Sequence, residues 1–125
     1  MLKEVLLIGM GGFIGSVARY YVSKLNLSLD LFSIPLGTLL VNVLGSLLLG
    51  FLTGIVVKSP ILTLEWRLFL MVGICGGFTT FSTFTSENMM IIHNGQFLSA
   101  ALYTGLSLLL GFIAVFGGYA ISNLL

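Results

Sequence analysis

Four long stretches of the chain carry almost no charged side chains, and this pattern limits the possible folds more than any other feature. The first stretch is interrupted only by Arg19, and the other three contain no charged residue. A helix needs about 20 residues to cross the hydrocarbon core of a membrane. Each stretch is long enough, so we predict an all-α integral membrane protein in which residues 1–125 form a single four-helix transmembrane domain. The predicted spans are Val5–Val22, Ile34–Val57, Leu68–Ser86 and Phe97–Leu125.

The composition excludes most other classes of protein. Charged residues make up 7% of the chain and hydrophobic residues 58%, whereas soluble domains are roughly 25% charged. A net charge of +1 provides no basic surface, so no nucleic-acid partner is expected. The sequence also lacks a histidine near a nucleophile, a pair of carboxylates and a phosphate-binding loop, so we do not expect an enzyme.

The cationic residues are divided almost evenly between the two sides of the membrane. With four spans, Lys3, Lys58 and Arg67 lie on one side, and Arg19 and Lys24 lie on the other. An excess of Lys and Arg on the cytoplasmic side normally fixes the orientation of a membrane protein. A difference of one charge, three against two, either suffices to fix it or allows insertion both ways round, and the sequence leaves both open.

The shortness of the chain bears on its assembly. Four packed helices fill their own core and leave little room for a water-lined path. A transport function would therefore require an oligomer. If both orientations occur, the simplest assembly is an antiparallel homodimer with its two-fold axis in the membrane plane.

Small residues recur at intervals of four in three of the predicted spans. Small residues at this spacing allow helix backbones to approach each other closely in a membrane. We therefore predict that most of them serve helix packing alone. They are Gly11 and Gly15 in the first span, Ser46, Gly50 and Gly54 in the second, and Gly73 and Gly77 in the third.

Polar residues form a stripe along the first half of the second span. Thr38, Asn42 and Ser46 are four residues apart, so they share one face of a helix. An amide in hydrocarbon needs hydrogen-bond partners, so the stripe either bonds a neighbouring helix or faces a polar pathway. Tyr103 and Ser107, also four apart, would continue such a pathway in the fourth span. The alternative for Tyr103 is a place in the aromatic belt at the membrane interface.

The third span contains a segment that is poorly suited to a continuous helix. Gly73, Gly76 and Gly77 are followed by six hydroxyl residues between Thr79 and Ser86. Glycine weakens a helix, and Ser and Thr compete for backbone hydrogen bonds, so we predict a break near residues 76–80. Irregular backbone at membrane depth occurs only where it is buried in protein or lines a cavity. The alternative is a glycine-rich kink that binds nothing.

Two phenylalanines and two charged residues complete the set of candidates. Phe81 and Phe84 are three residues apart and share a face of the helix that resumes after the break. The edge of a phenyl ring is positive, so it can help to hold a small anion. Arg19 either extends to the interface or attracts an anion. Glu87 ends the third span, where it is either interfacial or paired with Arg19.

Three segments together resemble the CrcB/Fluc family of fluoride channels. The third-span segment is highly specific, and the four-span layout agrees along the whole chain. The segments are Gly11-Gly12-Phe13-Ile14-Gly15 followed by Arg19-Tyr20, Gly37-Thr38-Leu39-Leu40-Val41-Asn42-Val43-Leu44-Gly45-Ser46, and Gly73-Ile74-Cys75-Gly76-Gly77-Phe78-Thr79-Thr80-Phe81-Ser82-Thr83-Phe84.

The resemblance implies an antiparallel, dual-topology homodimer in the cell inner membrane that exports fluoride passively through two pores. It also implies a structural sodium ion at the dimer centre, held by the backbone carbonyls of Gly76 and Thr79, or of the adjacent Gly77 and Thr80. Phe81 and Phe84 would line the pore, with Asn42 as a polar ligand and Arg19 and Glu87 near the vestibules. Further candidates along the path are Thr38, Ser82, Thr83, Tyr103 and Ser107.

The main alternative is a small dual-topology exporter of organic cations, similar to the small multidrug resistance family. Such a protein would need a carboxylate embedded in the membrane. The first span has none after Glu4, and Glu87 is expected at the end of a span, which disfavours this alternative. A second alternative is an assembly subunit that transports nothing.

Overall fold

The computed structural model describes residues 1–24 and 32–125, and four of its segments are long and apolar enough to cross a membrane. The first is helix α1, Leu2–Ser23, and the second is α2, Leu36–Lys58. The third segment, Leu64–His93, is divided into several elements, and the fourth is α6, Phe97–Ser122. The prediction of four helical spans is therefore confirmed.

The third segment consists of four helical elements in sequence. Helix α3, Leu64–Arg67, leads into the π-helix η1, Leu68–Cys75, which is followed by the single turn α4, Gly76–Phe78. Helix α5, Ser82–His93, begins after a short interruption. The π-helix was not predicted from the sequence, and the segment extends beyond both ends of the predicted span Leu68–Ser86.

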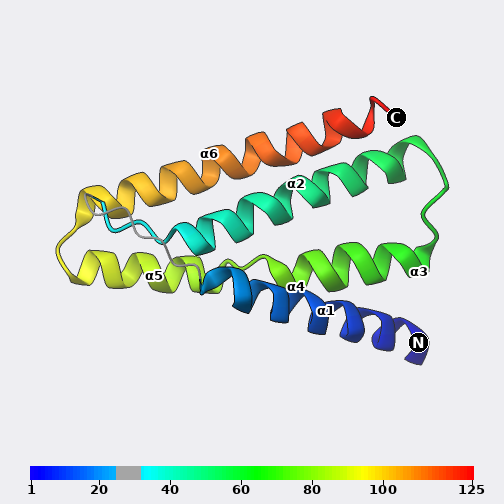
Figure 1. Cartoon of the computed structure of the whole chain (residues 1–125), viewed down its shortest axis with the longest axis horizontal. Coiled ribbons are helices and arrows are strands. Elements are labelled where there is room, and N and C mark those ends of the chain that lie inside the picture. The colour runs from blue at the N-terminus through cyan, green and yellow to red at the C-terminus, as the bar shows by residue number, and fades with distance from the viewer. Residues whose placement is uncertain (25–31) are drawn as a thin grey trace.

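The helices form two closely packed pairs (Figure 1). Helix α2 runs beside α6, while α1 packs against η1 and α4. Helix α5 lies against the first part of α6. Both termini and the connection between α2 and α3 lie at one end of the molecule, as expected for four spans.

Glycines make both helix pairs possible. A Cβ atom added to Gly11 or Gly15 would collide with a backbone carbonyl oxygen of η1, and one added to Gly73 would lie 2.8 Å from the Cα atom of Gly11. In the other pair, a Cβ atom on Gly50 would collide with the carbonyl oxygen of Val115 in α6. These contacts confirm the prediction that the small-residue motifs serve helix packing.

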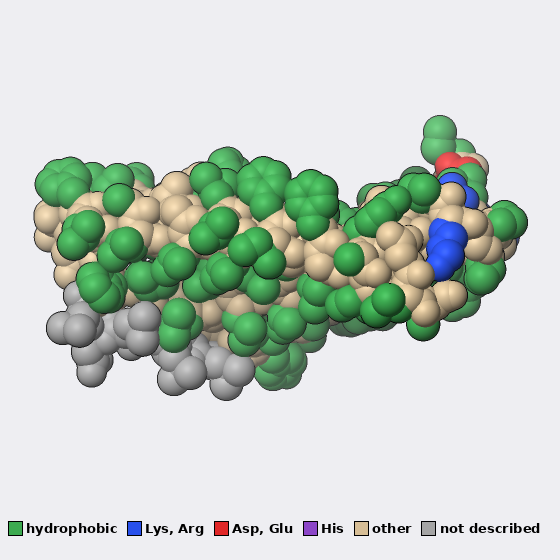
Figure 2. All heavy atoms as spheres, turned by 90° about the horizontal axis from the view of Figure 1, so that it is seen from above, with side chains coloured by type: hydrophobic (Ala, Val, Ile, Leu, Met, Phe, Trp, Pro, Cys, Tyr) green, Lys and Arg blue, Asp and Glu red, His purple; other side chains and the backbone are tan. Residues whose placement is uncertain are grey.

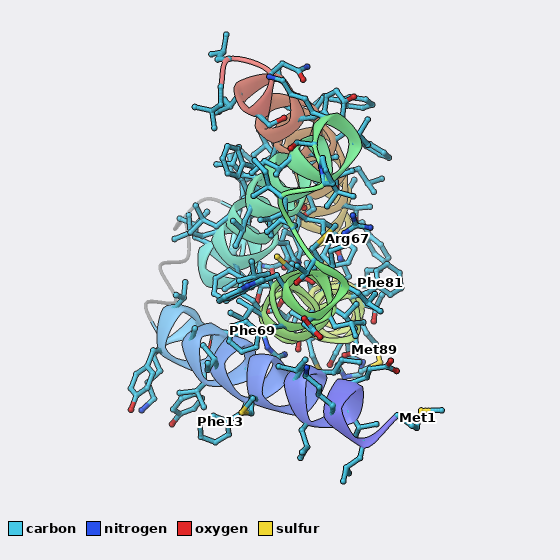
Figure 3. All side chains as sticks on the ribbon, turned by 90° about the vertical axis from the view of Figure 1, so that its right-hand side faces the viewer. Met1, Phe13, Arg67, Phe69, Phe81 and Met89 are labelled. Atoms are coloured by element: carbon cyan, nitrogen blue, oxygen red, sulfur yellow. The ribbon has the colours of Figure 1, made fainter. Side chains whose placement is uncertain are left out.

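Much of the surface is apolar. Figure 2 shows hydrophobic side chains over most of the visible face and charged side chains only near one end. The exposed side chains include Phe13 on α1, which is 72% exposed and points away from the other helices (Figure 3). Such a surface is expected where lipid tails or other membrane helices replace water.

The interruption in the third segment lies slightly later than predicted. Gly76 and Gly77 are helical, and the backbone becomes extended at Thr79, with φ −79° and ψ 155°. Gly77 is needed for packing, because an added Cβ atom would lie 2.7 Å from the carbonyl oxygen of Gly12. Gly77 therefore serves the contact with α1, and the break falls on the hydroxyl residues that follow, at the end of the predicted interval.

Candidate functional site

The side chain of Asn42 in α2 compensates for the lost hydrogen bonds at the break. Its Nδ2 donates to the carbonyl oxygen of Thr80 at 3.0 Å, and its Oδ1 accepts from the N–H of Thr80 at 2.8 Å. One side-chain amide thus pairs with both backbone groups of a single residue. Buried backbone groups must be paired, so this contact fixes where the helix can open.

Several backbone carbonyls lose their normal helical partners at the same place, and those of Gly76 and Thr79 are two of them. The N–H of Thr80 would bond to Gly76 in a continuous helix but donates to Asn42 instead. The N–H of Thr83 would bond to Thr79 but donates to Oγ1 of Thr80 at 3.1 Å. Within residues 1–24 and 32–125, neither the Gly76 nor the Thr79 carbonyl oxygen accepts a hydrogen bond. The family resemblance implied these two carbonyls or those of Gly77 and Thr80. The Gly77 carbonyl oxygen likewise accepts no hydrogen bond in the described parts of the chain, whereas that of Thr80 is bonded to Asn42.

A polar cavity of about 200 Å³ adjoins the break. Arg19 forms part of its wall, and the Nε atom of Arg19 is buried and has no hydrogen-bond partner within the described part of the chain. The cavity therefore offers a cation and several hydroxyls to a small guest. Its lining residues are Ser16, Arg19, Tyr20, Ser23, Thr38, Val41, Thr80 and Thr83.

Three of the polar lining residues were missed by sequence reasoning. Ser16, Tyr20 and Ser23 lie with Arg19 on α1, at spacings of three and four residues. This spacing places them on one face of the helix. The sequence signal that could have identified them was this polar face on an otherwise apolar span.

Glu87 is half-buried and lies within α5, so the prediction that the third helical segment ends there is wrong. Its Oε2 accepts from the Thr38 hydroxyl at 2.9 Å, and its Oε1 accepts from the Tyr103 hydroxyl at 2.9 Å. Helix α5 continues for another six residues to His93. The expected alternative of a pair with Arg19 is also wrong, since Lys3 and Glu65 form the only ion pair among the described residues.

Tyr103 is fully buried, which contradicts a place in an interfacial aromatic belt. Besides its bond to Glu87, its ring packs edge-on against Phe84, with the ring centroids 5.0 Å apart. Glu87 thus joins α2, α5 and α6, because Thr38 and Tyr103 come from the other two helices.

Phe81 and Phe84 lie together but differ in exposure. Their ring centroids are 6.0 Å apart, as expected for residues on one face. Phe84 is 9% exposed, whereas Phe81 is 76% exposed and lies at the outer edge of the bundle (Figure 3). One ring is therefore part of the core, and the other is presented on the surface beside the break.

Two other candidates lie apart from the cavity. Ser82 is exposed at the start of α5. The Oγ atom of Ser107 is buried and has no partner in the parts of the chain that are described. The structure thus brings Arg19, Thr38 and Thr83 together around the cavity and places Ser82 and Ser107 elsewhere.

A polar contact between α5 and α6 was also not predicted. Oγ1 of Thr104 donates to Oδ1 of Asn88 at 3.2 Å, and Nδ2 of Asn88 donates to the carbonyl oxygen of Phe84 at 3.2 Å. These residues lie in a wide groove of about 900 Å³ between the two helices. The sequence signal was only that Asn88 continues the face of Phe81 and Phe84.

Comparisons with known proteins agree on one family. Residues 6–119 match the family model described as CrcB-like protein, Camphor Resistance (CrcB). A protein of Elusimicrobium minutum named fluoride-specific ion channel FluC is 44% identical over 100% of this chain and 98% of its own length. A protein of Chlorobium chlorochromatii with the same name is 45% identical over 92% of this chain and 88% of its own length.

Proposed function

The chain belongs to the CrcB-like family, and we propose that it is a fluoride-specific ion channel rather than an enzyme. The observation that carries the proposal is a continuous polar region inside four apolar helices. It begins at the Arg19 cavity, passes Thr38, and reaches the carboxylate of Glu87 and the hydroxyl of Tyr103. Polar and ionisable groups at membrane depth are costly and usually mark a transport pathway.

The chemistry of this region suits a small, strongly hydrated anion. Removing water from such an ion is costly unless hydrogen-bond donors replace it. The cavity supplies the guanidinium of Arg19 and the hydroxyls of Ser16 and Thr83, whereas the Thr38 hydroxyl already donates to Glu87. These groups would strip and replace water stepwise. Few fixed charges are needed further along, because a site that binds too strongly does not release its ion.

The exposed ring of Phe81 supports a pore that a second copy completes. A ring that is 76% exposed beside the break lines no enclosed path within one chain. The groove between α5 and α6 offers room for part of a partner. We therefore propose a homodimer in which Phe81 and Phe84 line a pore at the interface, with Asn42, Ser82 and Ser107 as further pore residues. The positive ring edges would contact the anion.

The unbonded carbonyls at the break would suit a structural sodium ion at the dimer centre. Gly76 and Thr79 each leave one carbonyl oxygen without a hydrogen bond inside the described chain. Carbonyl oxygens are suitable ligands for a hard cation. Two carbonyls are few for such an ion, whereas two copies related by a two-fold axis would supply four. The ion would fix the two broken segments to each other.

The charge distribution supports an antiparallel, dual-topology arrangement in the inner membrane. Three cations lie on the side of the termini and two on the other, so the bias that fixes orientation is weak. An anion gains about 2.3 kcal/mol for each 100 mV of membrane potential. A negative cell interior would therefore drive fluoride outward without any other energy source.

The alternative of an organic-cation exporter needs an embedded carboxylate, and Glu87 is the only candidate among the described residues in the interior of a span. Both of its oxygens accept hydrogen bonds from hydroxyls of the same chain. A carboxylate held in this way is less available to a large cation than one that faces an open cavity. The relatives named as fluoride channels also favour the anion.

The proposal is tested by fluoride efflux from liposomes that contain the purified protein. A potassium ionophore provides the counter-current, and a fluoride electrode follows the release. We expect rapid fluoride efflux and no comparable efflux from chloride-loaded liposomes. Absence of fluoride release, or equal release of both ions, would contradict a fluoride channel.

A further inference from the structure

Lys24 is held beside the Arg19 cavity by a residue of its wall. The Nζ atom of Lys24 lies 4.6 Å from the centroid of the Tyr20 ring, and Tyr20 lines the cavity. A cation over an aromatic face is attracted by the quadrupole of the ring. The ring therefore restrains the ammonium group near the cavity, although Lys24 itself is exposed at the end of α1.

Arg19 alone does not make the surroundings of the cavity positive. Thr38, which forms part of the wall, donates its hydroxyl to the carboxylate of Glu87 at 2.9 Å. The carboxylate of Glu87 therefore lies one hydrogen bond beyond the cavity wall, where its negative charge opposes the positive charge of Arg19. Among the described residues, Lys24 is the third formal charge at this end of the molecule, and the sequence that follows it also contains Asp30.

We propose that Lys24 makes the electrostatic potential at this entrance more positive and thereby raises the rate at which fluoride is captured from dilute solution. The inference rests on the proposed channel function and adds a residue to it. Lys24 would act through its field and would not bind the dehydrated ion. A unit charge roughly 10 Å away in water changes the local concentration of a monovalent anion by about a factor of two.

This mechanism has two consequences that a structural role lacks. The effect of Lys24 is present when fluoride is scarce and absent when fluoride saturates the entrance. It also weakens with added salt, because the screening length falls from about 30 Å at 0.01 M to about 8 Å at 0.15 M ionic strength. A damaged fold would lower conduction under all of these conditions.

The test changes the charge after the protein has folded and inserted, so that topology is the same in every adduct that is compared. Lys24→Cys is reconstituted in liposomes, and the thiol is then modified with a cationic, a neutral or an anionic methanethiosulfonate: the aminoethyl, methyl or sulfonatoethyl reagent. We expect fluoride efflux at low fluoride and low salt to be about twofold higher with the cationic than with the neutral adduct. The anionic adduct should lower efflux by a similar factor.

The controls separate an effect of charge at position 24 from a general effect of the reagents on the protein. Cys75 is 2% exposed, so the wild-type protein should not respond to the reagents. Lys3→Cys removes an equal charge at the opposite end of α1, where Lys3 pairs with Glu65 at 2.9 Å, and its adducts should not differ in efflux. Equal efflux from the three Lys24→Cys adducts, or the same differences at saturating fluoride, would overturn the inference. Absence of fluoride efflux from the wild type would instead contradict the channel function itself.

Discussion

The side chain of Asn42 pairs with both backbone groups of Thr80, donating to its carbonyl oxygen at 3.0 Å and accepting from its N–H at 2.8 Å. This contact links α2 to the point where the third segment opens. It also releases the carbonyl of Gly76, whose usual partner is the N–H of Thr80. The broken helix is therefore a specific structure stabilised by a neighbouring span and not a result of glycine content alone.

Replacing Asn42 by Leu should destabilise the protein and abolish most of its fluoride efflux. The substitution leaves two backbone groups of Thr80 unpaired, and a buried unpaired group costs about 1–3 kcal/mol. Unfolding in a denaturing detergent measures the loss of stability. Asn88→Leu is the matched control, because Asn88 bonds within α5 and to α6 away from the break. A larger effect at Asn88 than at Asn42 would refute the assigned role.

Replacing Phe81 by Ile should strongly reduce fluoride efflux, while the protein still folds and dimerises. The ring is 76% exposed, so its loss removes few contacts within one chain. Phe13→Ile, at another exposed phenylalanine on α1, should leave efflux nearly unchanged. Fluoride efflux from liposomes measures transport by the two variants, and their size-exclusion profiles show whether they still fold and dimerise. Unaltered transport by Phe81→Ile would remove this ring from the pore.

Replacing Gly15 by Ala should lower stability by several kcal/mol. The new methyl group would collide with the carbonyl oxygen of Ile74, and overpacking costs about 1–3 kcal/mol or more. The same change at Gly105, where an added Cβ would meet no atom within 4 Å beyond its own stretch of helix, should stabilise the helix by up to about 1 kcal/mol. Thermal denaturation in detergent compares the stability of the two variants. Similar melting temperatures would contradict the packing of α1 against η1.

Removing either donor to Glu87 should destabilise the protein, and the two effects should not be additive. Tyr103→Phe and Thr38→Val each delete one hydrogen bond to the carboxylate, and such bonds to a charged group contribute about 1.5–3 kcal/mol. The double variant leaves the carboxylate without either partner. A double-mutant cycle of unfolding free energies measures the coupling. Strict additivity would indicate that the two hydroxyls act independently.

Dual topology predicts that one position is accessible from both sides of the membrane. In Asn94→Cys, the new thiol lies in the connection between α5 and α6, at the end of the molecule opposite the termini. Half of the copies should react with an impermeant reagent added outside, and the rest only after the membrane is permeabilised. Labelling from a single side would show one fixed orientation.

The helices were predictable because they depend on composition along the chain. Stretches without charge must span the membrane, and small residues at intervals of four must pack. The position of the break was less predictable, since it depends on a contact between distant residues. Gly77 was predicted both to weaken the helix and to pack; it is helical and packs against α1, since a Cβ added to it would lie 2.7 Å from the carbonyl oxygen of Gly12. The partner of Asn42 lies 38 residues away and follows only from the packing of α2.

The candidate site was likewise predictable only in part. The spacing of Thr38 and Asn42 predicted a polar face, and Arg19 was expected near a vestibule. The place of Glu87 was misjudged, because the apolar stretch appeared to stop at the first charge. Two hydroxyls from neighbouring helices make that charge acceptable inside the bundle, so α5 continues past it. Sequence alone does not reveal such compensation between helices.

The most direct test of a fluoride-selective pathway is the reversal potential of the purified protein in a planar lipid bilayer. A fluoride gradient is imposed across the bilayer while chloride and sodium are kept equal on both sides. The current should reverse at the equilibrium potential of fluoride and should follow it when the gradient is inverted. A current that reverses at zero, or that follows an imposed chloride gradient, would contradict the proposed function.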